Sequence, residues 1–306
     1  MSARYDCADP VQLLEGITQA ELALRRGELV VLPTDTVYGI AAEAFDPVAV
    51  DGLLKAKGRG RDMPPPVLVG TVRAAMALVM DLADTGKDLI DEFWPGGLTL
   101  VCRSSPTLVW DLGETKGTVA VRMPLHHVAL DLLKKTGPLA VSSANVSGQP
   151  PATTADEAMA QLGDSVSVYL DAGPCPGDVP STIVDLTGSV PRLLRRGVIS
   201  VDRLQEVVPL AIVDDVDSDD VDSDVVPEDV PDVVPEQAPD VVPEQGPEEI
   251  PEDFAGGAGA ADEAGGVAPD EVDEAQVARE MAPGDSPGAQ EGPADQVKPV
   301  HRDATE

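Results

Sequence analysis

Short apolar runs rich in β-branched residues alternate with helical patterns up to about residue 213, and this alternation restricts the fold more than any other feature. Short apolar runs bounded by Gly, Pro or Asp are typical of buried strands. The predicted strands lie at 29–32, 67–69, 98–102, 119–122, 139–142, 166–170, 182–185 and 192–194. The predicted helices lie at 11–24, 48–57, 72–82, 88–93, 127–135, 155–162 and 201–207. Interleaved helices and strands predict an α/β fold with a mixed sheet.

The alternation stops near residue 213, where the charge of the chain also changes. The first 213 residues carry 18 Lys and Arg against 26 Asp and Glu, whereas the remainder carries 3 against 29. The pentapeptide Asp-Val-Val-Pro-Glu begins at 224, 232 and 240, and proline removes the backbone donors that helices and sheets need. With few large apolar groups to offset the ordering entropy, this segment is expected to stay disordered. We therefore predict a catalytic domain at 1–213 and a disordered acidic tail at 214–306. The tail either has no specific partner, discourages RNA binding or docks a basic protein.

Cysteine and histidine usage gives no sign of a metal site. Cys7, Cys102 and Cys175 lie far apart, without a CxxC pair or a Cys/His cluster, so structural zinc is not expected. His126 and His127 are adjacent and are interpreted as surface or structural residues. The N-terminus lacks the apolar run of a signal peptide, and no apolar stretch approaches the roughly 20 residues of a membrane helix. We expect a cytoplasmic protein without a membrane partner.

Six short polar motifs are candidates for ligand binding. They read PTDTVYG at 33–39, KGR at 57–59, TVAVR at 118–122, SSANVSG at 142–148, STIVD at 181–185 and RRG at 195–197. Hydroxyl groups with fixed lysine and arginine charges suit a nucleotide and a small anionic substrate. PTDTVYG alone also fits a capped strand-to-helix turn and KGR a solvated helix end, whereas SSANVSG is too polar for an ordinary buried turn. The chain contains neither a P-loop nor a G-x-G-x-x-G segment after a strand, and nothing supports a covalent nucleophile.

In this order and spacing, the motifs resemble those of the YrdC-like (TsaC-type) threonylcarbamoyl-AMP synthases over roughly residues 10–208. The resemblance implies a twisted mixed sheet with flanking helices and a concave cavity. It implies a nucleotidyltransferase that forms threonylcarbamoyl-AMP and pyrophosphate from L-threonine, bicarbonate and ATP. The product would serve tRNA threonylcarbamoyladenosine modification through a downstream transferase, and tRNA or double-stranded RNA is a possible partner.

The resemblance also implies roles for individual residues. Lys57 and Arg59 are the catalytic candidates and would bind the ATP phosphates. Residues expected at L-threonine are Thr34, Arg122, Ser142 and Ser181, with Arg122 suited to the carboxylate. Residues expected at the nucleotide are Lys57, Arg59, Thr118, Ser143, Asn145 and Arg195, and Ser142 is a further candidate there. Mg²⁺ is expected through the ATP phosphates rather than through a protein ligand set.

Two features depart from the family pattern. Pro64–Pro66 replace a basic or amide residue, and the acidic tail replaces the second folded domain of longer members, so contacts and lid functions assigned there do not carry over. An alternative is a double-stranded RNA-binding or ribosome-maturation module of the same fold, which the net charge of −8 over 1–213 disfavours. The carbamoyltransferase of hydrogenase maturation is longer and carries Cys-rich motifs that are absent here. A scaffold acting mainly through the tail would not need the motif set.

Overall fold

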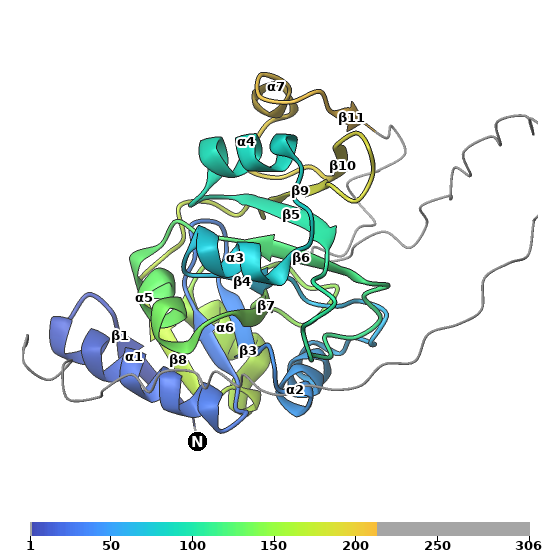
Figure 1. Ribbon diagram of the computed structural model, residues 1–306. Coiled ribbons are helices and arrows are strands. Elements are labelled where there is room, and N and C mark those ends of the chain that lie inside the picture. The colour runs from blue at the N-terminus through green and yellow to red at the C-terminus, as the bar shows by residue number, and fades with distance from the viewer. Residues whose placement is uncertain (1, 213–306) are drawn as a thin grey trace, which may run out of the picture. The chain divides into compact units, whose positions relative to one another are not determined.

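The computed structural model describes residues 2–212, which form a mixed sheet flanked by helices (Figure 1). The described strands run in the order β1-β8-β2-β3-β7-β4-β6-β5-β9-β10-β11. The strands are β1 Ala3–Asp6, β2 Val30–Leu32, β3 Gly39–Glu43, β4 Val67–Leu68, β5 Leu98–Arg103, β6 Thr118–Arg122, β7 Leu139–Ser143, β8 Val168–Asp171, β9 Thr182–Asp185, β10 Arg192–Arg195 and β11 Ala211–Ile212. The helices are α1 Pro10–Arg25, α2 Pro47–Lys57, α3 Val72–Leu78, α4 Asp84–Phe93, α5 His127–Thr136, α6 Ala155–Leu162 and α7 Val201–Gln205, with one 3-10 turn at Gly163–Ser165. The predicted α/β class and mixed sheet are confirmed, whereas the predicted tail at 214–306 lies outside the described residues.

Helices cover both faces of the half of the sheet that contains β2, β3 and β8. On β2, Val30 and Leu32 pack in a cluster with residues of α1 and α5, whereas Val31 packs in a cluster with residues of α2 and α6. Successive side chains of a strand point to opposite faces, so this alternation places a core on each side. That is why the strands read as continuous apolar runs in the sequence rather than as alternating polar and apolar residues.

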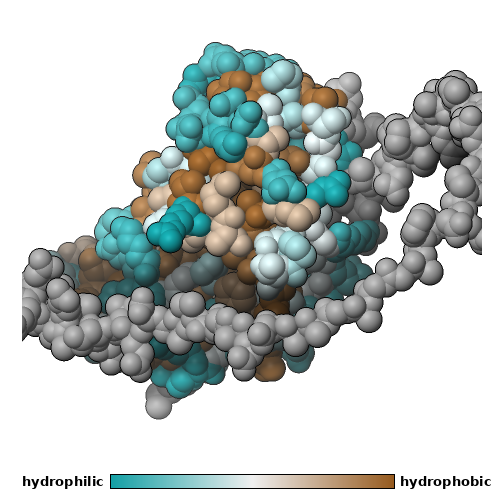
Figure 2. Space-filling model, viewed as in Figure 1, coloured by the Kyte–Doolittle hydropathy of each residue, from teal (hydrophilic) through white to brown (hydrophobic). Residues whose placement is uncertain are grey.

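A third hydrophobic cluster lies under α3, α4 and α7 and against β4, β5 and β6. Leu89 and Ile90 of α4 and Leu204 of α7 are buried in it. The outer residues of α4 are exposed and charged, and Figure 2 shows this hydrophilic surface above a hydrophobic one on the face that carries α3. Val72 and Met76 of α3 are 38% and 40% exposed, so α3 covers the sheet with a partly apolar outer side.

Three strands were absent from the prediction. β3 has the sequence Gly-Ile-Ala-Ala-Glu, whose glycine and alanines have low strand propensity, and it forms because it pairs on both sides with β2 and β7. β1 and β11 are the two edge strands and pair on one side only. Long-range pairing rather than local propensity therefore creates these strands.

The helix ends follow the expected signals. Asp9 and Asp46 accept hydrogen bonds from backbone N–H groups of α1 and α2, and each is followed by proline at the first helical position. α2 ends at Gly58, which has a φ of 70° in the left-handed region. None of the helices in residues 2–212 is long and apolar enough to cross a membrane.

Candidate functional site

The first polar motif, at 33–39, forms the connection between β2 and β3. Gly39 of β3 pairs with Ser143 of β7, and Ile40 pairs with Ser142. Because β3 and β7 are antiparallel, the loop before β3 lies beside the end of β7, where the SSANVSG motif begins. Strand pairing therefore joins two motifs that are about a hundred residues apart in the chain.

Thr34 shapes this loop through its own hydroxyl group. Its Oγ1 donates to the carbonyl of Val37 at 2.6 Å and accepts the N–H of Thr36 at 3.1 Å. Such short-range bonds allow threonine to stabilise a turn that neither helix nor sheet provides. Thr34 and Thr36 are 4% and 2% exposed, so these hydroxyls stand inside the protein.

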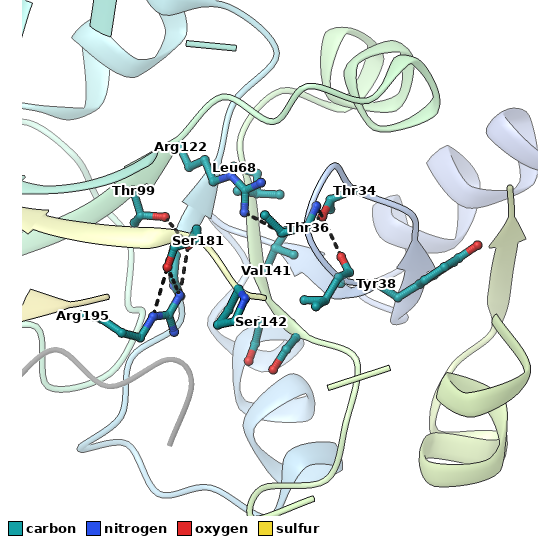
Figure 3. Close-up of a pocket in the computed structure, with 15 residues that line it drawn as sticks. Thr34, Thr36, Tyr38, Leu68, Thr99, Arg122, Val141, Ser142, Ser181 and Arg195 are labelled. Carbon is teal, nitrogen blue, oxygen red and sulfur yellow. Dashed lines mark hydrogen bonds between the residues drawn. The ribbon is translucent and has the colours of Figure 1, made fainter. Parts of the chain in front are cut away.

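Hydroxyl groups and two arginines line a cavity between the two halves of the sheet. Figure 3 shows Thr34 and Thr36 on one side and Thr99, Ser181 and Arg195 on the other. The lining residues are Thr34, Thr36, Val37, Tyr38, Gly39, Pro66, Leu68, Thr99, Arg122, Val141, Ser142, Ser143, Pro180, Ser181 and Arg195. These described lining residues include two cations and no carboxylate, which suits an anionic ligand.

Chemistry rather than size distinguishes this cavity from a second hollow. The cavity volume is about 50 Å³, whereas the hollow beside the 3-10 turn measures about 430 Å³ and is lined by Glu28, Lys55 and small residues. Binding sites need a few converging polar groups in addition to space. Only the smaller cavity brings together several of the motifs that the sequence singled out.

Lys57 and Arg59 lie next to this cavity and contact its serine wall. The Lys57 ammonium donates to the carbonyl of Ser143 at 2.6 Å and to that of Asn145 at 3.0 Å. Arg59 donates through Nε to Ser147 at 2.8 Å and through Nη1 to Ser142 at 3.4 Å. Lys57 is fully buried and Arg59 is 7% exposed. The end of α2 therefore supplies two fixed cations to the SSANVSG loop.

Arg122 and Arg195 are held in different ways. Arg122 forms an ion pair with Asp35 at 2.7 Å, and burial lowers the pKa of Arg122 while Asp35 opposes that shift. Arg195 donates through Nε and Nη2 to the carbonyl of Ser181, at 3.1 and 2.7 Å. Ser181 Oγ in turn lies 2.8 Å from Thr99 Oγ1. Both guanidinium groups thus have fixed orientations before any ligand binds.

Of the residues predicted for the site, Thr118 stands apart. The cavity is lined by Thr34, Arg122, Ser142, Ser143, Ser181 and Arg195, with Lys57, Arg59 and Asn145 immediately behind the serines. Thr118 is at the opposite end of β6 from Arg122, about 13 Å away along the strand, and its hydroxyl donates to the carbonyl of Thr115. The structure does not bring Thr118 to the cavity.

Several cavity residues had no assigned role in the sequence analysis. Thr36 belongs to a motif in which only Thr34 was assigned, and Asp35 between them holds Arg122. Thr99 interrupts the apolar run at 98–102, and a hydroxyl in a buried strand was the available signal for it. Leu68 and Val141 give the cavity apolar patches that no motif would reveal.

The described residues contain no cluster of acidic side chains that could bind a metal ion. The structure, over residues 2–212, groups no three His, Cys, Asp or Glu side chains in a way that could hold an ion. The oxygen atoms nearest to Lys57 Nζ are the backbone carbonyls of Ser143 and Asn145, followed by Asn145 Oδ1 at 3.2 Å and Ser143 Oγ at 3.4 Å.

Comparisons with known proteins identify similar sequences and folds. A family model named Sua5/YciO/YrdC, with the description telomere recombination, matches residues 22–197. A protein of Mycobacterium tuberculosis strain H37Rv, provisionally named threonylcarbamoyl-AMP synthase, is 56% identical over 208 residues, which is 68% of this chain and 96% of that protein. The threonylcarbamoyl-AMP synthase of Bacillus subtilis is 36% identical over 214 residues, or 69% of this chain and 62% of that protein.

A solved structure shows the same arrangement of elements. The crystal structure of Pyrococcus abyssi Sua5 complexed with L-threonine has a TM-score of 0.64 and 33% identity, covering 70% of this chain and 62% of that one. The family model, over residues 22–197, spans all the residues that line the cavity in the described part of the chain.

Proposed function

The chain belongs to the Sua5/YciO/YrdC family, and from this premise we propose that it is a threonylcarbamoyl-AMP synthase. The reaction joins L-threonine, bicarbonate and ATP into threonylcarbamoyl-AMP with release of pyrophosphate and water, which makes the enzyme a nucleotidyltransferase. Its relatives in M. tuberculosis and B. subtilis carry the synthase name, and a related fold is known with L-threonine bound.

One observation carries the proposal: four buried cations surround a cavity of hydroxyl groups. Lys57, Arg59, Arg122 and Arg195 are all between 0 and 8% exposed, and they lie in or directly behind the cavity wall. Burying a cation is costly unless its surroundings compensate for lost water. A fold that buries four around one small space is suited to anions, here a triphosphate and an amino acid carboxylate.

The chemistry requires little beyond position and charge. The threonine amine captures bicarbonate as a carbamate, and a carbamate oxygen attacks the α-phosphorus of ATP while the bond to pyrophosphate breaks. Lys57 and Arg59 stabilise the phosphate charge, and Arg122 receives the threonine carboxylate. Preorganised charges of this kind lower the barrier without a strong general base.

Magnesium and further partners belong to the same proposal. Mg²⁺ would enter with the ATP phosphates and neutralise part of their charge. The product would pass to a transferase that modifies tRNA in the cytoplasm. Double-stranded RNA binding or ribosome maturation is not favoured as the main role, because many exposed cations already pair with carboxylates, as in Arg25–Glu21, Arg26–Glu28, Lys55–Asp51 and Lys87–Asp84.

The test is ATP-dependent release of pyrophosphate by the full chain, with L-threonine and bicarbonate each omitted in turn. We expect release only when both are present, together with a product of the mass of threonylcarbamoyl-AMP. Pyrophosphate release that continues without threonine would exclude the proposed reaction.

A further inference from the structure

The carboxylate of Asp35 fixes the loop 33–38 to the end of β6. Asp35 Oδ1 accepts from Arg122 Nη2 at 2.7 Å and from the backbone N–H of Leu125 at 2.9 Å. The side chains of Asp35 and Arg122 are 14% and 7% exposed, so this ion pair is largely screened from water. Asp35 does not line the cavity, but Arg122 and the neighbouring Thr36 do.

Beside its bond to Asp35, the guanidinium group of Arg122 has further N–H donors that a ligand can use. A guanidinium group has five N–H donors. Arg122 gives Nε to the carbonyl of Gly96 at 2.9 Å, one Nη1 donor to Thr36 Oγ1 at 3.0 Å and one Nη2 donor to Asp35. One donor on Nη1 and one on Nη2 remain beyond these bonds, and a fork of two N–H groups is what binds a carboxylate in a bidentate manner.

Asp35 differs from the other two groups that accept from Arg122, because it also accepts from the backbone N–H of Leu125. Gly96 and Thr36 each accept a single bond from Arg122, whereas Asp35 binds Arg122 and also holds the backbone just beyond β6. Without Asp35, the Nη2 end of the guanidinium would lose its anchor and the loop 33–38 would lose its link to Leu125. Only the bonds to Gly96 and Thr36 would then hold the guanidinium group.

We propose that Asp35 is a positioning residue for L-threonine, which acts by orienting the guanidinium fork of Arg122 toward the substrate carboxylate. The proposal rests on the proposed function and adds a residue to that site. Asp35 acts through geometry rather than charge, because a carboxylate beside Arg122 repels the substrate carboxylate that the arginine binds. The orientation that it imposes outweighs this repulsion, since a contact misplaced by about 1 Å costs as much as 10²-fold, here in kcat/KM through the KM for L-threonine.

Three substitutions separate geometry from charge. Asp35→Ala removes both bonds, and we expect the KM for L-threonine to rise tenfold or more while kcat and the KM for ATP stay within about threefold. Asp35→Asn keeps an oxygen that accepts from Arg122 and Leu125, so the threonine KM should stay within about threefold of wild type. Asp35→Glu keeps the charge but moves the carboxylate by one methylene group, and the threonine KM should rise as it does in Asp35→Ala.

A matched control is available in the same domain. Asp185 and Arg192 form a second aspartate–arginine pair, at 3.2 Å, in which Asp185 is buried and Arg192 is partly exposed, and neither lines the cavity. Asp185→Ala should lower the melting temperature without changing the threonine KM. Wild-type enzyme without threonine-dependent activity would refute the proposed function itself. Active wild type with an unchanged threonine KM in both Asp35→Ala and Asp35→Glu would overturn the role of Asp35, as would Asp35→Asn behaving like Asp35→Ala.

Discussion

Burying a lysine or arginine side chain costs free energy unless other groups replace the water that the cation loses. In this domain, backbone and side-chain oxygens take the place of that water. The Lys57 ammonium lies against the carbonyl oxygens of Ser143 and Asn145 and the side-chain oxygen of Asn145, at 2.6, 3.0 and 3.2 Å. Dipoles hold the cation in place, so its charge does not have to reorganise when a phosphate arrives. Lys57 thus combines a structural role in the SSANVSG loop with its proposed role in catalysis.

Replacing Lys57 at the end of α2, or Arg59 just after it, should therefore reduce the synthesis of threonylcarbamoyl-AMP. We expect Lys57→Ala and Arg59→Ala each to lower kcat/KM by about 10² or more, the size typical of losing one preorganised charge. Lys55→Ala is the matched control, since Lys55 lies two residues before Lys57 with its side chain 75% exposed and paired with Asp51. Pyrophosphate release measures all three variants, and circular dichroism confirms that they are folded. Near-normal rates in both Lys57→Ala and Arg59→Ala would show that these two residues do not bind the ATP phosphates.

The hydroxyls of the cavity should make the enzyme selective for its amino acid. L-valine has nearly the shape of L-threonine but lacks the hydroxyl, so a polar group such as that of Thr34 or Ser181 would lose a partner. Sites built to bond a substrate hydroxyl discriminate by as much as about 10⁴-fold. Competition between threonine and valine in the pyrophosphate assay gives the ratio of kcat/KM, and equal values would show that neither residue reads the side chain.

The C-terminal end of α2 determines where the cations of Lys57 and Arg59 lie. It begins at the Asp46 cap and ends at Gly58, whose left-handed φ of 70° turns the chain so that Arg59 leaves the helix toward Ser142 and Ser147. Glycine adopts this conformation without the steric cost that a Cβ atom brings. The end of this helix therefore determines where Arg59 lies.

Alanine should change the stability of the protein in opposite directions at Gly52, inside α2, and at Gly58, which caps its C-terminal end. A Cβ atom at either Gly52 or Gly58 would meet nothing within 4 Å, so backbone conformation alone decides. Gly58→Ala should lower the free energy of unfolding by about 1 kcal/mol because of its positive φ. Gly52→Ala, inside the helix, should raise it by about 0.5–1 kcal/mol. Urea unfolding followed by tryptophan fluorescence measures both, and a loss of stability in Gly52→Ala would contradict the argument.

The net charge of −34 is distributed unevenly along the full chain. Residues 1–213 account for −8 and residues 214–306 for −26. The motif residues all belong to the first part. A large negative net charge repels polyanions such as RNA. Salt screens this repulsion beyond roughly 8–10 Å at physiological ionic strength.

Removing residues 214–306 should leave the chemistry intact while changing the interaction with RNA. We expect kcat within about threefold of the full chain, because the truncation keeps every lining residue found in the described part of the chain, 2–212. The truncation should bind tRNA more tightly at low salt and about equally at high salt. Steady-state kinetics and filter binding at two salt concentrations compare the two proteins. Loss of adenylate formation would show that the acidic segment takes part in the site.

Local signals in the sequence were enough to predict most of the elements and to single out the polar motifs. Aspartate caps followed by proline, glycine at helix ends and apolar periodicity act over a few residues, so they can be read without knowing the fold. The hydroxyl and cation motifs are also visible locally, but the resemblance to the family assigned their individual residues. Of those, the structure places Thr34, Arg122, Ser142, Ser143, Ser181 and Arg195 around one cavity.

Contacts between distant segments required the folded structure. β3 exists because β2 and β7 flank it, and the pairing of Gly39 with Ser143 is what brings two motifs together. The link from Asp35 to Arg122 and the distance of Thr118 from the cavity follow from the same long-range packing. Strand order and register depend on the sum of many weak contacts between distant residues, which no short stretch of sequence contains. The sequence therefore determined the elements and the chemical groups, whereas the packing of the sheet decided which of those groups face each other.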